Sequence, residues 1–212
     1  MDKQDDGFKI VFITVGHTAA GKSTFAQAVA EKCGIIYISA GDIKRSSVEN
    51  YSARNSLDSF LLDKGYTGAT IKAIEVLGKQ DSVLVDATFF QKERRISIEY
   101  EIRKIFKKTI IVWLYCNCSN YEKVVKRIKK RFEMSENEGE QADDVTVYNY
   151  ILNNFDNLNI DQFTECTIIV SINTDENELT RIESNFNFVS MNNKLLLSIF
   201  DFIDIYLESK KK

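Results

Sequence analysis

Residues 16–23 carry the clearest chemical signature in the sequence, because GHTAAGKS fits the pattern G-x-x-x-x-G-K-[ST]. Gly16 and Gly21 permit backbone angles that other residues resist, which lets the main chain wrap around a phosphate group. Where such a loop runs into a helix, the free N–H groups and the helix dipole favour a bound anion. We expect Lys22 to reach the β- and γ-phosphates of a nucleotide and Ser23 to ligate Mg²⁺.

The whole loop is expected to contact ATP. The predicted nucleotide contacts are Gly16, His17, Thr18, Ala19, Ala20, Gly21, Lys22, Ser23 and Thr24. Lys22 is also given a catalytic role, because a cation at this place can neutralise charge on a transferring phosphoryl group. His17 is interpreted as a residue that fills the loop rather than as a base.

Charged residues follow the second apolar run of the chain, in the sequence AGDIKRS at 40–46. Asp42 and Arg45 form the pattern D-x-x-R. Asp42 could take the proton of an acceptor hydroxyl, and Arg45 could bind a phosphate or carboxylate of the acceptor. The alternative is an aspartate that caps a helix beside a solvated arginine. The spacing fits both interpretations equally well.

A further group of charged residues follows the third apolar run, in the sequence VDATFFQKERR at 85–95. Asp86 stands where a carboxylate would organise the metal ion or orient the acceptor. Arg94 and Arg95 open the next helical pattern, and Arg95 is predicted to bind the substrate. A solvated helix face is the alternative for these arginines.

Arg127 and Arg131 lie four residues apart in the basic segment KVVKRIKKRF, so they share one face of a predicted helix. The functional interpretation is that one of them closes on the transferring phosphoryl group. A solvated basic face is the alternative for each.

Several elements must position these residues. Apolar runs with the length of buried strands lie at 8–15, 35–39, 82–87, 109–116 and 166–172. None alternates cleanly, which is typical of parallel strands that are covered on both faces. Helical patterns lie between them, at 22–33, 91–107 and 120–132. The alternation predicts an α/β P-loop NTPase fold, with a doubly wound five-stranded parallel sheet, helices on both faces and ligands at the carboxyl ends of the strands.

Two segments depart from this alternation. The polar, acidic stretch EMSENEGEQADDV has no periodicity and predicts a surface lid over about 131–146. The C-terminal run has apolar and acidic residues on opposite sides and predicts a docked amphipathic helix. We therefore expect a core over 1–175 and a C-terminal helical extension, packed on the core, over 176–212.

The composition excludes some classes of protein. The 212 residues carry a net charge of −3, so no general basic field draws the chain to nucleic acid. The apolar stretch at 195–207 is too short to span a membrane and contains Asp201 and Asp204. The acidic N-terminus is unlike a secretory signal, and the four cysteines are interpreted as free thiols. We expect a cytoplasmic protein that does not contact a membrane.

The loop at 16–23 occurs in several classes of enzyme, and the rest of the chain favours one of them. A signalling GTPase needs N-K-x-D, whereas Asn193-Lys194 is followed by two leucines. An AAA-type or helicase ATPase usually ends its metal-binding strand in Asp-Glu, whereas Ala87 follows Asp86. A small kinase needs only a loop for phosphate, a carboxylate and lid cations, because phosphoryl transfer depends on positioning and charge neutralisation.

In their order along the chain, GHTAAGKST, GDIKR, VDATFFQKERR and the basic helix before an acidic lid resemble the polynucleotide-kinase-like and zeta-toxin-like P-loop kinases over about residues 8–175. The resemblance implies a fold like that of nucleoside monophosphate kinases, with ATP and Mg²⁺ as cofactors. It implies that Lys22 and Ser23 hold ATP and Mg²⁺, that Asp42 is the base, that Arg45 binds the acceptor and that Arg127 or Arg131 is a lid arginine. The acidic lid and the residues past 175 depart from the family pattern.

The predicted function is transfer of the ATP γ-phosphoryl group to a hydroxyl, on a small molecule or nucleotide or on a polynucleotide 5′ end. Basic residues at 103–108, 123–131 and 210–212 favour a nucleic acid, whereas the acidic residues at 133–144 would repel one. The balance favours a small molecule or a nucleotide end. The alternative is a non-catalytic or weakly hydrolysing ATP-binding regulatory module.

Overall fold

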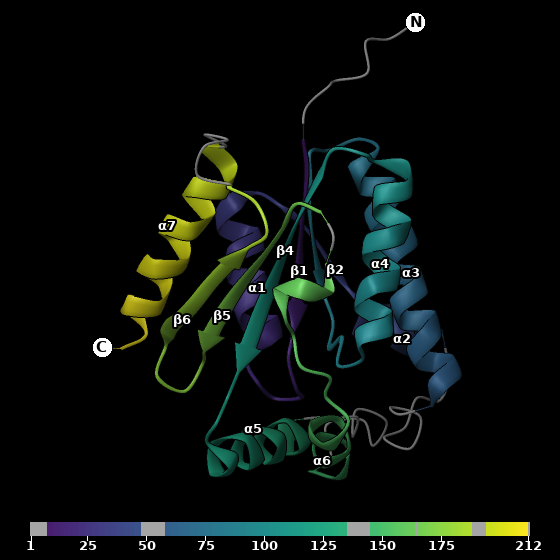
Figure 1. Ribbon diagram of the computed structural model, residues 1–212. Helices are drawn as coiled ribbons and strands as arrows, with labels where there is room; N and C mark the ends of the chain where they lie inside the picture. Colours follow the sequence, from purple (N-terminus) through teal and green to yellow (C-terminus); the bar gives the residue numbers. More distant parts are fainter. Residues whose placement is uncertain (1–7, 48–57, 135–144, 164, 188–193, 212) are drawn as a thin grey trace, which may run out of the picture.

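The computed structural model describes residues 8–47, 58–134, 145–163, 165–187 and 194–211 (Figure 1). Its centre is a six-stranded sheet in the order β2-β3-β1-β4-β5-β6. The strands are β1 (Lys9–Val15), β2 (Ile36–Ser39), β3 (Ser82–Asp86), β4 (Thr109–Asn117), β5 (Thr167–Asn173) and β6 (Glu178–Ser184). The strands β1 to β5 are parallel, and all five match the predicted apolar runs.

Strand β6 is a correction to the predicted architecture. It pairs antiparallel with β5, so the sheet is mixed and has six strands rather than five. It also lies in the region that was expected to be helical. Its sequence, ELTRIES, holds only Leu179 and Ile182 as apolar residues, because an edge strand with an exposed face needs little apolar surface. The strand therefore lacks the continuous apolar run that marks β1 to β5 in the sequence.

Helices cover both faces of the sheet (Figure 1). Helices α1 (Lys22–Cys33) and α7 (Lys194–Ser209) lie on one face, and α3 (Ser59–Leu77) and α4 (Lys92–Ile105) lie on the other. The side chains of β1 alternate between the two: Ile10 and Phe12 pack in the first core, and Val11 and Ile13 in the second. This double burial explains why the parallel strands read as continuous apolar runs.

The carboxyl ends of the parallel strands carry the remaining elements. The short α2 (Ala40–Ser46) follows β2 directly, and α5 (Tyr121–Met134) and α6 (Val145–Asn153) lie beyond the ends of β4 and β5 (Figure 1). A 3-10 turn, η3 (Ile160–Gln162), precedes β5. Of the predicted lid, 131–134 end α5 and 145–146 begin α6, whereas 135–144 lie outside the described residues. No helix among the described residues is long and apolar enough to cross a membrane.

Candidate functional site

The phosphate-binding loop joins β1 to α1 at the centre of the sheet. Gly16 has φ +140°, and a Cβ atom there would lie 2.1 Å from the carbonyl oxygen of Cys116, so only glycine fits. Gly21 is left-handed, with φ +85°, and stands at the N-cap of α1. The N-terminal N–H groups of α1 therefore open toward the loop, which is the arrangement that binds phosphate.

Lys22 and Ser23 begin α1 and both line the same cavity. The Nζ atom of Lys22 donates a hydrogen bond to the carbonyl oxygen of His17 at 2.7 Å, so the side chain curls over the loop. The side chain of Ser23 is exposed. A cation and a free hydroxyl at the start of a helix are the groups that would meet the phosphates and the metal ion of a nucleotide.

His17 is a buried structural residue of the loop. Its Nδ1 lies 2.9 Å from the carbonyl oxygen of Thr18, and its Nε2 lies 3.2 Å from that of Cys118. The ring of Tyr148, from α6, meets it edge-on with centroids 5.1 Å apart. Burial lowers the pKa of His17, so the ring is neutral near pH 7. These contacts tie the loop to the end of β4 and to α6.

Two side chains from other elements hold the carbonyl groups of the loop. Arg127 of α5 donates to the carbonyl oxygen of Ala19 at 3.0 Å and to that of Thr174 at 3.4 Å. The hydroxyl of Thr174, just after β5, donates to the carbonyl oxygen of Ala20 at 2.8 Å. Among the described residues, Arg127 therefore contacts the phosphate-binding loop, and the side chain of Arg131 lies outside the described part of the chain.

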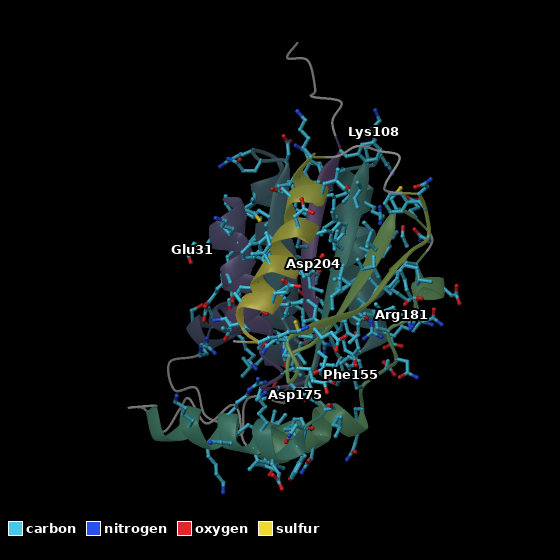
Figure 2. All side chains as sticks on the ribbon, turned by 90° about the vertical axis from the view of Figure 1, so that its left-hand side faces the viewer. Glu31, Lys108, Phe155, Asp175, Arg181 and Asp204 are labelled. Atoms are coloured by element: carbon cyan, nitrogen blue, oxygen red, sulfur yellow. The ribbon has the colours of Figure 1, made fainter. Side chains whose placement is uncertain are left out.

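Asp175 fixes the start of α5, which carries Arg127. Its carboxylate accepts hydrogen bonds from the Cys118 thiol and from the Asn120 N–H, both at 2.8 Å. Lys123 Nζ donates to the carbonyl oxygen of Asp175 at 2.9 Å. Figure 2 shows Asp175 between the lower end of the sheet and α5. Nothing in the local sequence around Thr174 or Asp175 predicted these contacts, because their partners lie far away in the chain.

A cavity of about 210 Å³ extends from the loop toward α2, α3 and α6. Its polar side includes Lys22, Ser23, Asp86, Lys44 and Arg45. The other side is apolar and is formed by Leu62, Tyr66, Phe90, Val147 and Ile151. The cavity thus joins a phosphate-binding end, a second cationic end and an apolar wall, and such a mixture suits a small anionic molecule with an apolar body.

The two residues of the D-x-x-R pattern lie differently with respect to this cavity. Arg45 lines it, whereas Asp42 is not among the lining residues. The Asp42 carboxylate is 67% exposed and pairs with Arg45 along α2. Ser39 caps α2, since its hydroxyl accepts the Asp42 N–H at 3.1 Å. The alternative, in which Asp42 itself caps the helix, is therefore wrong, because Ser39 is the cap and Asp42 lies in the first turn.

Arg95 is fully buried and lies outside the cavity lining. Its guanidinium donates to the carbonyl oxygens of Phe89 at 2.7 Å and of Asp156 at 2.9 Å, and so ties the segment after β3 to the segment after α6. Arg94 stacks over the ring of Tyr66, with its Cζ 4.7 Å from the ring centroid. The predicted role of Arg95 as a substrate ligand has no support in this position, because backbone carbonyls surround the guanidinium.

Asp86 ends β3, is 5% exposed and lines the cavity with Ser23. Its carboxylate accepts hydrogen bonds from the Thr14 hydroxyl at 2.6 Å and the Tyr37 hydroxyl at 2.7 Å. The described residues hold no cluster of three or more His, Cys, Asp or Glu that could bind a metal on its own. A hydroxyl and one carboxylate do fit Mg²⁺ that arrives with nucleotide phosphates, since this ion keeps several waters and takes few protein ligands.

Known proteins resemble this chain in sequence and in fold. Adenylate kinase isoenzyme 1 of Sus scrofa is 29% identical over 133 residues, which are 60% of this chain and 66% of that enzyme, so the match spans less than two thirds of the relative. A putative kinase from Chloroflexus aurantiacus superposes with a TM-score of 0.63 at 14% identity, over 91% of this chain and 96% of its own. Chaetomium thermophilum Kti12, solved with ADP-AlF3, has a TM-score of 0.58 at 15% identity, over the same shares of the two chains.

These structures confirm the α/β P-loop NTPase fold that the sequence predicts. A family model described as an AAA domain matches residues 11–149, from β1 through the first part of α6. The match includes the phosphate-binding loop, α2, Asp86 and α5. Because this model covers more than half of the chain, the protein belongs to the AAA-domain family of P-loop proteins, although Ala87 rather than a glutamate follows Asp86.

Proposed function

We propose that the protein is an ATP-dependent kinase that transfers the γ-phosphoryl group of ATP to a small anionic acceptor in the cavity beside the phosphate-binding loop. One observation carries this proposal: Lys22 and Ser23 of the loop line the same cavity as Lys44 and Arg45 of α2. A nucleotide phosphate at one end and an anionic acceptor at the other would then share one cavity. Such proximity is the main contribution that a protein makes to phosphoryl transfer.

The residues of the loop have distinct tasks in this proposal. The N–H groups at the start of α1 hold the phosphates, and Lys22 neutralises charge on the transferring group. Ser23 and Asp86 would hold Mg²⁺, which neutralises the β- and γ-phosphate oxygens when it is bound. The bonds from Arg127 and Thr174 keep the loop carbonyls turned away from the anion.

The acceptor end of the cavity indicates what kind of molecule binds there. Lys44 and Arg45 would pair with a phosphate or carboxylate, for which arginine has the matching bidentate geometry. Tyr66, Phe90 and Ile151 would contact the apolar body of the acceptor. We favour a hydroxyl acceptor that also carries an anionic group. The proposal needs little from a base, because the transition state of phosphoryl transfer is loose.

A second candidate is a kinase whose acceptor is itself a phosphate, such as a nucleoside monophosphate. The similarity to adenylate kinase isoenzyme 1 favours it, together with the two cations that line the far end of the cavity. A phosphate oxygen carries no proton that must leave at neutral pH, so a carboxylate base would be unnecessary. In that case catalysis would not require Asp42 to contact the acceptor, which agrees with its exposed position.

The experiment that tests the proposal supplies γ-labelled Mg·ATP with three sets of acceptors. These are nucleoside monophosphates, a pooled extract of small metabolites, and RNA and DNA oligonucleotides with 5′-hydroxyl ends. Label on a metabolite supports the first candidate, and label on a nucleoside monophosphate supports the second. Label on the oligonucleotides would instead support the polynucleotide kinase function, with Lys126 and Lys129 on the exposed side of α5 as contacts to the strand.

The same assay distinguishes an enzyme from an ATP-binding regulatory module. A module would bind ATP, measured by titration, but would transfer label to none of these acceptors. Release of labelled inorganic phosphate at the same rate with and without every acceptor would indicate weak hydrolysis. Either result would overturn the proposed kinase activity.

A further inference from the structure

Three neighbouring strands each contribute one polar side chain to a cluster that is centred on the Asp86 carboxylate. Thr14 comes from β1, Tyr37 from β2 and Asp86 from β3. The Thr14 hydroxyl lies 2.6 Å from Oδ1 of Asp86, and the Tyr37 hydroxyl lies 2.7 Å from Oδ2. Each carboxylate oxygen therefore accepts one hydrogen bond from a hydroxyl. Thr14 is buried and Tyr37 is half-buried, and neither residue lines the cavity.

The strand register brings these residues together. In the parallel pairs, Ile13 faces Val85 and Ser39 faces Asp86, and alternate residues point to the same face of the sheet. Thr14, Tyr37 and Asp86 therefore share the face that α1 covers. Tyr37 faces Leu84 in the register, so its long side chain reaches diagonally along the sheet to Asp86.

The two donors differ in the choices they have. The Thr14 hydroxyl accepts the N–H of Ala87 at 3.0 Å. Its own hydrogen has two acceptors within reach, the carbonyl oxygen of Ala87 at 3.1 Å and Oδ1 of Asp86, which is nearer at 2.6 Å. The Tyr37 hydroxyl donates its hydrogen to Oδ2 of Asp86 at 2.7 Å. The Asp86 carboxylate therefore accepts hydrogen bonds from Thr14 and Tyr37, and Asp86 also lines the cavity with Ser23.

We propose that Tyr37 is a positioning residue for the metal site: together with Thr14 it fixes the Asp86 carboxylate so that Asp86 meets Mg²⁺ bound to ATP. This inference rests on the proposed function, in which Asp86 and Ser23 serve that ion. Mg²⁺ demands near-ideal octahedral geometry, so a carboxylate that rotates freely would bind it less well. Hydrogen bonds to a metal ligand typically change metal affinity by about 10- to 100-fold.

The test measures the Mg²⁺ requirement of ATP binding, which needs no acceptor and no turnover. A fluorescent ATP analogue is titrated in EDTA and then at rising Mg²⁺ concentrations. For Tyr37→Phe we expect the affinity in EDTA to stay within about twofold of the wild type, as for a substitution that touches no phosphate contact. We expect the half-saturating Mg²⁺ concentration to rise about tenfold. Tyr100→Phe, on the exposed face of α4, is the matched control and should change neither value.

A pair of variants at Thr14 tests the second donor in the same way. Thr14→Val removes the hydroxyl with little change of shape, and it should raise the Mg²⁺ requirement as Tyr37→Phe does. Thr14→Ser keeps the hydroxyl and should restore the wild-type requirement. Thr14→Val exchanges the hydroxyl for a methyl group, whereas Thr14→Ser removes only the methyl group. This comparison therefore stays decisive even if loss of the Tyr37 hydroxyl lowers the melting temperature.

A combination with Asp86→Asn shows whether Tyr37 acts through Asp86. We expect Tyr37→Phe to add no further Mg²⁺ requirement in the Asp86→Asn background, because residues of one network are not additive. An unchanged Mg²⁺ requirement in Tyr37→Phe would overturn the inference, as would an equal loss of ATP affinity with and without Mg²⁺. Failure of the wild type to phosphorylate any acceptor would overturn the proposed function but would leave this metal measurement intact.

Discussion

The two ends of the cavity are built in different ways. The phosphate-binding end is a single loop whose carbonyl groups are held by Arg127 and Thr174 and whose turn requires Gly16. The acceptor end takes residues from α2, α3, α6 and the segment after β3, and several of them, such as Leu62, Phe90 and Ile151, are apolar. Under the proposed function, the first end would have one chemical task, common to every nucleotide, whereas the second end would determine which acceptor is used.

The largest expected effect is at the phosphate-binding end. Lys22→Ala should reduce phosphoryl transfer by about 10³-fold, because it removes the cation that meets the charge of the transferring group. The measurement is the initial rate of label transfer from γ-labelled ATP. Lys32→Ala, at the exposed end of α1, is the control and should keep the wild-type rate. A Lys22→Ala variant with full activity would contradict the assignment of this end.

A substitution at the acceptor end should change the KM for the acceptor rather than the rate of phosphoryl transfer. Arg45→Ala should raise the KM for the acceptor by about 10- to 100-fold, since hydrogen bonds to charged groups contribute about 1.5–3 kcal/mol. The KM for ATP should stay near that of the wild type. Arg181→Ala, on the exposed β6, serves as the control. If Arg45→Ala raised the KM for ATP instead, the two ends would not be separate.

A smaller effect is expected from the hydrogen bond that Thr174 donates to the phosphate-binding loop. Thr174→Val should lower ATP affinity about tenfold, because it removes a hydrogen bond that holds the carbonyl oxygen of Ala20. Thr180→Val is a close control, since the Thr180 hydroxyl also donates to a backbone carbonyl, that of Ser171 at 3.0 Å, but on β6. Equal ATP affinities in the two variants would show that this bond does not support the loop.

The smallest effect is expected at Asp42. Its carboxylate is two-thirds exposed, pairs with Arg45 and does not line the cavity, so Asp42→Asn should lower kcat by less than about fivefold. The kcat for the best acceptor is the value to measure. A loss of about 10²-fold would instead indicate that Asp42 acts as the general base, as its place in the sequence suggests.

Much of the fold was predictable from the sequence, because local patterns encode it. The five parallel strands are continuous apolar runs, and the glycines and Lys22 of the loop lie within eight residues of each other. Strand β6 escaped because an edge strand carries few apolar residues. The predicted five-stranded parallel sheet therefore became a mixed sheet with six strands.

The candidate site was predictable only where its residues are neighbours in the chain. Thr14, Tyr37 and Thr174 are ordinary residues in the sequence, and their roles depend on partners 49 to 154 residues away. Arg95 illustrates the opposite error. Its position in the first turn of a helix is one where a substrate-binding arginine could lie. In the structure, however, the Arg95 guanidinium donates to the backbone carbonyls of Phe89 and Asp156. Sequence patterns show that a charge exists but not what surrounds it.

One measurement tests the central claim that ATP and an acceptor meet in this cavity. Wild-type protein is given γ-labelled Mg·ATP and a pooled extract of small metabolites and nucleoside monophosphates, and the label on organic products is compared with the label released as inorganic phosphate. We predict that most of the label reaches an organic acceptor and that Lys22→Ala abolishes this transfer. Release of all the label as inorganic phosphate, at a rate that the extract does not change, would contradict the account.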